Sequence, residues 1–145
     1  MQKATKRAEF MKQLSAAGIR PSAQRLAILE FISSCRCHPT ADDIYSALAP
    51  TQPTLSRTTV FNCLRLLAGK GLLNDIDIAS ESTRYDSASL RPHAHFMCRE
   101  CRKIFDIPFN MEAIPAPDDF QCDNVNVFFK GLCPECSKKK SDTTT

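Results

Sequence analysis

Residues 56–86 decide the fold, and they read SRTTVFNCLRLLAGKGLLNDIDIASESTRYD. Ser56 is a favourable helix N-cap, because its hydroxyl can accept a free amide of the first turn. After it, Val60, Leu64 and Leu67 recur at the spacing of one helix face. This stretch therefore begins with an amphipathic helix that buries one stripe.

The pattern after this helix changes from a helical period to alternation. Apolar and polar residues alternate over residues 73–78, and a second short stretch, residues 83–86, follows a polar turn. This pattern predicts a β-hairpin. Upstream, residues 6–17 and 23–33 read as amphipathic helices, and Thr40 opens a third helix with a capping-box pattern. Helices followed by such a hairpin are typical of a winged helix-turn-helix, whose last helix enters the major groove of DNA.

Charge and surface composition favour a polyanionic partner for the first half. Residues 1–70 have a balance of +6 and residues 71–145 a balance of −3. A basic surface binds nucleic acid because each neutralised phosphate releases counterions. A plain helical domain whose polar face is only solvated is the alternative. The face of the 56–67 helix that the core does not need carries Arg57, Thr58, Phe61, Asn62 and Arg65.

Two C-x2-C pairs are the most specific feature of the second half: Cys98 with Cys101, and Cys133 with Cys136. Each pair can chelate from a tight turn, and two pairs complete the tetrahedral four-thiolate shell that Zn²⁺ favours. No position remains for water, so the predicted zinc is structural. The alternative is thiol–disulfide exchange, for which one C-x2-C at a helix start would suffice.

The other four of the eight cysteines are less informative. Cys63 is predicted to be a small buried hydrophobic residue. Cys35 and Cys37 stand next to His38, which leaves a reactive or metal-capturing role open. For Cys122, beside a predicted strand, the sequence favours no role.

Histidines and acidic residues suggest a second metal. His93 and His95 lie on an extended segment, where alternate side chains point to the same side. His38 precedes a helix, Asp86 closes the hairpin, and Asp106 ends a predicted strand. Two or three imidazoles with one or two carboxylates suit Fe²⁺, Mn²⁺ or Zn²⁺. H-x-H pairs also occur as ordinary polar surface, so spacing alone leaves the site open.

The chain as a whole reads as a globular α+β protein. Hydrophobic residues make up 43% and charged residues 24%. No apolar run approaches the roughly 20 residues that span a bilayer, and the N-terminus has no secretory pattern, so we expect a cytoplasmic location without membrane contact. We expect two domains, 1–84 and 85–145. The polar tail from Lys138 is expected to be disordered.

Several blocks together resemble the ferric uptake regulator (Fur) family of metal-dependent repressors, and its peroxide-sensing branch most. The resemblance extends over roughly residues 8–138. The blocks that carry it are GIRPSAQR (18–25), HPTADDIY (38–45), TVFNCLR (59–65), RYD (84–86), HAHFMCREC (93–101) and CPECSK (133–138).

This resemblance implies a homodimeric, non-enzymatic transcription repressor that binds double-stranded operator DNA. It implies an N-terminal winged helix and a small α/β dimerisation domain with the four-cysteine zinc. A regulatory Fe²⁺ or Mn²⁺, or else Zn²⁺, would be held by His38, Asp86, His93, His95 and Asp106. DNA contacts are expected from Arg20, Gln24, Arg25, Ser56, Arg57, Thr58, Thr59, Phe61, Asn62 and Arg65.

The sensed signal is less defined than the family. Peroxide sensors of this type have Asp at the position of Asp106, where iron sensors tend to have Glu, so peroxide sensing is favoured. Pro92 and Ala94 replace the His and Asp of an additional metal site in iron-type members. The alternatives are an iron- or zinc-level repressor of metal uptake genes, a thiol redox enzyme using the C-x2-C pairs, and a zinc module that binds another protein.

Overall fold

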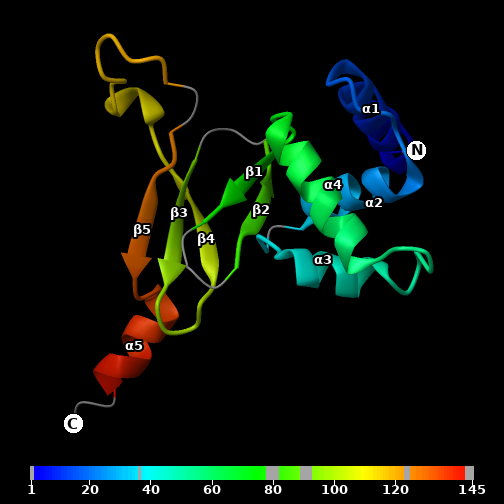
Figure 1. Ribbon diagram of the computed structural model, residues 1–145. Helices are drawn as coiled ribbons and strands as arrows, with labels where there is room; N and C mark the ends of the chain where they lie inside the picture. Colours follow the sequence, from blue (N-terminus) through cyan, green and yellow to red (C-terminus); the bar gives the residue numbers. More distant parts are fainter. Residues whose placement is uncertain (1, 36, 78–81, 89–92, 123–124, 143–145) are drawn as a thin grey trace. The chain divides into compact units, whose positions relative to one another are not determined.

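The computed structural model describes residues 2–35, 37–77, 82–88, 93–122 and 125–142 (Figure 1). The chain divides into two compact units, Met1–Leu90 and Arg91–Thr145, and each is described by itself. No helix among the described residues combines the length and apolarity needed to cross a membrane. The assignment of residues 1–84 and 85–145 to DNA binding and dimerisation stays a prediction.

The first unit consists of four helices followed by a two-stranded antiparallel sheet (Figure 1). In the sheet, Leu73 lies opposite Ser87 and Ile76 lies opposite Arg84. This order confirms the predicted winged helix-turn-helix. The elements are α1 (Gln2–Ala16), α2 (Ala23–Ser34), α3 (Ala41–Leu48), α4 (Arg57–Gly69), β1 (Leu73–Ile76) and β2 (Arg84–Ser87).

Side-chain caps fix where the last three of these helices begin. Ser22 and Ser56 each accept the amide of the residue three positions later. At α3 the predicted capping box is complete, because Thr40 Oγ1 accepts from the Asp43 amide at 3.2 Å and the Thr40 amide donates to Asp43 Oδ2 at 2.9 Å. Each cap contributes about 1 kcal/mol.

The core of the first unit lies between these helices. Val60, Leu64 and Leu67 of α4 are fully buried, as their spacing predicts. They belong to one cluster with residues of α1, α2 and α3, including Leu14, Ile28 and Ile44. Burying one such side chain contributes about 1.5–3 kcal/mol, so this cluster holds the exposed face of α4 in place.

The second unit is built on a three-stranded sheet with β3 in the centre (Figure 1). Strand β4 pairs with β3 antiparallel and β5 pairs with it in parallel. A single 3-10 turn follows β4. The elements are β3 (His93–Cys98), β4 (Ile104–Pro108), η1 (Met111–Ala113), β5 (Phe128–Gly131) and α5 (Pro134–Asp142).

The expectation of a disordered tail from Lys138 is wrong for residues 138–142, which continue α5. Lys139 and Lys140 lie in the last turn, where positive charge interacts favourably with the helix dipole. Lys140 Nζ also pairs with Glu100 Oε2 at 3.1 Å. Local composition did not reveal this contact between α5 and the turn after β3. Residues 143–145 lie outside the described residues.

Candidate metal centres and DNA-facing helix

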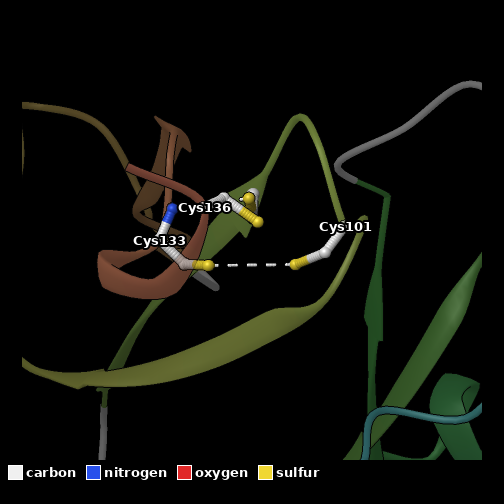
Figure 2. Close-up of side chains that lie close together, drawn as sticks. Cys101, Cys133 and Cys136 are labelled. Carbon is white, nitrogen blue, oxygen red and sulfur yellow. Dashed lines mark hydrogen bonds between the residues drawn. The ribbon is translucent and has the colours of Figure 1, made fainter. Parts of the chain in front are cut away.

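The four predicted zinc cysteines come together in the second unit. Cys98 ends β3, Cys101 lies in the turn that follows, and Cys133 and Cys136 flank the start of α5. Their sulfur atoms all lie within 4.8 Å of one another. Cys101 and Cys133 face each other (Figure 2). Their sulfur atoms are 3.9 Å apart. In a tetrahedral shell with Zn–S bonds of about 2.3 Å, neighbouring sulfurs lie about 3.8 Å apart.

Backbone hydrogen bonds hold the turn that presents the first pair. The Cys98 amide donates to the Lys103 carbonyl at 3.0 Å, and the Arg102 amide donates to the Cys98 carbonyl at 2.9 Å. Arg102 has a φ of 62°, which tightens the turn. The Arg99 amide donates to the Gly131 carbonyl at 2.8 Å and so ties this turn to β5. The two C-x2-C pairs are therefore positioned by the sheet itself.

The thiols of this cluster differ in acidity. Burial acts to raise the pKa of Cys98, but amides of Cys133, Cys101 and Glu100 donate to its sulfur and lower the pKa to about 6. A hydrogen bond with Cys133, together with burial, raises the pKa of Cys136 to about 12. Four such sulfurs become thiolates together only when a cation compensates their charge. The cluster fits structural Zn²⁺, which takes four thiolates and leaves no open position.

A second donor group in this unit lies on β3 and β4. His93 and His95 point to the same side of β3, and their Nε2 atoms are 3.1 Å apart. Asp106 lies directly opposite His95 in the sheet. Its Oδ1 is 3.3 Å from His93 Nε2 and 3.6 Å from His95 Nε2. Two imidazole nitrogens and one carboxylate oxygen thus converge, which is a donor set for Fe²⁺, Mn²⁺ or Zn²⁺.

The other two predicted regulatory ligands meet within the first unit. His38 and Asp86 are both buried, and His38 Nε2 lies 4.0 Å from Asp86 Oδ2. Strand β2 brings them together, because the Tyr85 amide donates to the Pro39 carbonyl at 3.0 Å. Asp86 Oδ1 accepts the Ser87 amide at 2.8 Å, which orients the carboxylate. Two of the five predicted ligands therefore belong to the first unit and three to the second.

The exposed side of α4 carries the predicted recognition residues. Phe61 is 50% exposed, although it is a large apolar side chain, and Arg57, Thr58, Asn62 and Arg65 are also exposed. The start of α2 joins this surface. Together the two helices line an open depression of about 650 Å³, whose walls include Arg20, Gln24, Arg25, Thr59 and Asn62.

Several predicted DNA-binding residues have contacts within the unit. Ser56 caps α4, and Thr59 shares a 2.8 Å hydroxyl contact with it. Arg25 Nη1 donates to the Arg20 carbonyl at 2.6 Å. Arg57 pairs with Asp42, and its guanidinium also lies 4.6 Å from the centre of the Tyr45 ring. That restraint on Arg57 was not predicted, because it links α4 to α3 across fifteen residues of sequence.

The remaining cysteines separate into different environments. Cys63 is buried, as predicted, and burial raises its pKa to about 11 although Arg25 lowers it. Cys35 and Cys37 are joined by a disulfide, which the sequence did not predict. The adjacent C-x-C spacing was the only signal for it. Cys122 is exposed.

A sequence model of the ferric uptake regulator family matches residues 16–127 of the chain. The chain belongs to the ferric uptake regulator family. This match confirms the resemblance that the sequence blocks indicated. In this Fur-family protein the candidate sites lie on the winged helix and on the second unit.

Individual relatives narrow the comparison. The peroxide operon regulator of Bacillus subtilis is 36% identical over 138 residues, which cover 92% of this chain and 94% of that protein. The structure of the PerR protein from Streptococcus pyogenes is 27% identical, with a TM-score of 0.53, and the match covers 90% and 92% of the two chains. The Helicobacter pylori Fur structure shares the fold, with a TM-score of 0.73, 16% identity and 90% of each chain covered.

Proposed function

We propose that this protein is a metal-dependent transcription repressor, without enzymatic activity, that senses peroxide through a regulatory Fe²⁺ or Mn²⁺. The observation that carries the proposal is the convergence of His93, His95 and Asp106 on one side of the second unit's sheet. The identity to the Bacillus subtilis peroxide operon regulator supports the peroxide signal. A cytoplasmic location is part of the same proposal.

The regulatory ion would take ligands from both units. His93, His95 and Asp106 would bind it from the second unit, and His38 and Asp86 from the first. An ion that binds all five ligands stabilises the arrangement of the two units that presents them together. Because this arrangement is also the one that binds DNA, metal binding raises the affinity for DNA. Bound Fe²⁺ would supply the reduction of peroxide at the site. The side chains of His38 and Asp86 are buried, and their role is to close the shell.

DNA binding would use the exposed face of α4. Arg57 and Arg65 supply positive charge for phosphates or guanine edges, and Asn62 offers the amide pair that matches adenine. Phe61 would contact a thymine methyl group, which explains an exposed aromatic ring on this helix. Arg20, Gln24, Arg25, Thr58 and Thr59 would line the same contact surface, while Ser56 positions the helix start.

The protein would bind its operator as a homodimer formed by the second unit. Phe105, Phe128 and Phe129 are exposed on that unit's sheet, and Val125 and Phe120 add further exposed apolar surface. A second copy would cover these side chains. Two recognition helices in one dimer then reach successive major grooves of a symmetric operator.

The test is anaerobic fluorescence anisotropy with DNA from the protein's own promoter. The regulatory site is stripped while the zinc is retained, and Fe²⁺, Mn²⁺ and Zn²⁺ are titrated separately before peroxide is added. We expect Fe²⁺ and Mn²⁺ to activate binding, and peroxide to abolish only the Fe²⁺ form. Activation by Zn²⁺ alone would identify a zinc-level regulator. Indifference to all three metals would refute the proposed regulatory site.

A further inference from the structure

The disulfide between Cys35 and Cys37 lies in the connection from α2 to α3. The two Cα atoms are 5.3 Å apart. This separation is within the range that a disulfide bridges without backbone movement. The two cysteines are therefore already close enough for the bond, and closing or opening it requires no large rearrangement of α2 or α3.

This bond contributes little to the stability of the fold. A disulfide stabilises mainly by restricting the unfolded chain, and the effect grows with the length of the loop that it closes. Here the bonded cysteines are only two positions apart. Exposed disulfides are also the ones that reductants reach. Cys37 is exposed and Cys35 is half-buried, so the pair has the features of a reversible bond.

The residue after this pair is His38, and the connection around it is fixed on both sides. Before it, the Cys35 amide donates to the Phe31 carbonyl at 2.9 Å. After it, Arg84 Nη1 donates to the His38 carbonyl at 3.2 Å, and Thr40 caps α3. His38 itself has a φ of 50°, an uncommon conformation for a residue other than glycine. The bond between the cysteines can form and break, and it lies next to the residue whose position it would affect, His38.

We propose that Cys35 and Cys37 are a reversible dithiol–disulfide site that a hydroperoxide oxidises and that tunes metal binding through His38. The second half of this statement rests on the proposed function, because it requires His38 to be a ligand of the regulatory metal. The first half does not.

The oxidation needs no metal. The exposed Cys37 sulfur attacks the hydroperoxide and the O–O bond breaks, so that Cys37 becomes a sulfenic acid and an alcohol or water leaves. The Cys35 sulfur then displaces the sulfenic oxygen, which leaves as water, and the S–S bond forms. Two electrons pass from the two thiols to the peroxide. In the reverse direction, a reducing thiol attacks Cys37 and expels Cys35, whose sulfur accepts the Cys37 amide at 3.2 Å. A second reducing thiol then attacks the first in this mixed disulfide, releases Cys37 as a thiol and leaves as the external disulfide.

The disulfide form presents His38 toward Asp86 in the arrangement described above. A ligand group that is held in its binding geometry loses less freedom when it binds. We therefore expect the disulfide form to bind the regulatory metal more tightly than the dithiol form. His38 is the only proposed metal ligand next to the pair in the sequence.

The first measurement reads the bond directly. The full chain, with zinc retained and the regulatory site stripped, is reduced, treated with hydrogen peroxide, alkylated and digested with trypsin. Trypsin also cleaves after Arg36, so Cys35 lies on the 26–36 fragment and Cys37 on the 37–57 fragment, and neither fragment contains another cysteine. We expect oxidation to keep these two fragments joined and unalkylated, about 2 Da lighter than the two free thiol fragments together, and reduction to separate them and restore two alkylatable thiols. A pair that stays reduced, or that captures a metal ion instead, would overturn the proposal.

The second measurement is the Mn²⁺ affinity of the reduced and oxidised proteins. We expect at least about threefold tighter binding by the disulfide form. The double variant C35S/C37S should show one affinity under both conditions, and the exposed-cysteine control C122S should behave as the unaltered chain. Equal affinities in the unaltered chain would refute the coupling. If H38A leaves Mn²⁺ binding unchanged, the proposed function fails at this ligand while the disulfide result stands.

Discussion

Asp106 of β4 lies directly opposite His95 of β3, and the carboxylate Oδ1 is 3.6 Å from the imidazole Nε2. His93, two residues before His95, points to the same side and lies 3.3 Å from the same oxygen. Side chains alternate along a strand, so a slip of one residue in the β3–β4 register would move Asp106 away from both histidines. The sheet register is therefore what creates this donor group.

Replacing Asp106 tests whether these three side chains bind the regulatory ion. Asp106→Asn removes the negative charge but preserves the size of the side chain, so the sheet should remain folded. We expect Mn²⁺ affinity to fall by at least on the order of 10–100-fold, and metal-activated DNA binding to fall with it. Calorimetric Mn²⁺ titration and anisotropy measure the two effects. Glu112→Gln, which removes an exposed carboxylate outside the cluster, is the matched control, and equal losses in both variants would point to general charge instead.

The four-cysteine centre should be required for the second unit to fold. Cys136→Ser removes one of four ligands, and structural zinc binding contributes on the order of 10 kcal/mol to such folds. We expect loss of bound zinc, determined by elemental analysis, and loss of the strand signal in circular dichroism. Cys122→Ser should retain both. A zinc-free Cys136→Ser protein that is still folded would contradict the structural role.

Local patterns predict much of this structure because they act over a few residues. The capping box at Thr40, the buried stripe through Val60 and Leu64, and the two C-x2-C pairs all follow from spacing along the chain. Contacts between distant segments are not encoded in this way. Arg57 of α4 pairs with Asp42 of α3, and Lys140, in the part of α5 that was expected to be disordered, pairs with Glu100.

The metal ligands show the same division. Alternation predicts that His93 and His95 share one side of a strand, but only the β3–β4 register places Asp106 beside them. His38 and Asp86 are far apart in the sequence, and their proximity depends on the pairing of β2 with the segment around Pro39. Residue type and spacing alone therefore did not decide whether these five residues form one metal site. The set of five ligands was predicted from the family resemblance.

Cys63 should be inert toward alkylating reagents near neutral pH. Burial raises its pKa to about 11 from 9.0, so the neutral thiol predominates well above the pH at which an ordinary thiol ionises. In the folded protein, iodoacetamide at pH 8 should modify the exposed Cys122 first, and Cys63 only after denaturant is added. Peptide mass spectrometry of the 58–65 fragment follows the reaction. Rapid labelling of Cys63 in the folded state would contradict its burial.

The pairing of Arg57 with Asp42 should weaken DNA binding, because the carboxylate competes with phosphates for the guanidinium. Both side chains are largely exposed, so the pair contributes at most about 1 kcal/mol to stability and its removal leaves the fold intact. Asp42→Asn should therefore increase operator affinity. Arg57→Ala or Arg65→Ala should weaken operator binding by about 1–3 kcal/mol if the side chain contacts a base. If it contacts a phosphate instead, the slope of log affinity against log salt concentration should fall by about one.

Anisotropy titrations at several salt concentrations distinguish these outcomes. Asp43→Asn is unsuitable as a control, because Asp43 completes the α3 capping box. Asp75→Asn removes an exposed carboxylate from β1 of the same unit and is the better match. If Asp42→Asn and Asp75→Asn increase affinity equally, the gain comes from net charge, since each removes one negative charge from the basic unit. A larger gain for Asp42→Asn alone identifies Arg57 as the group that the carboxylate withholds from DNA.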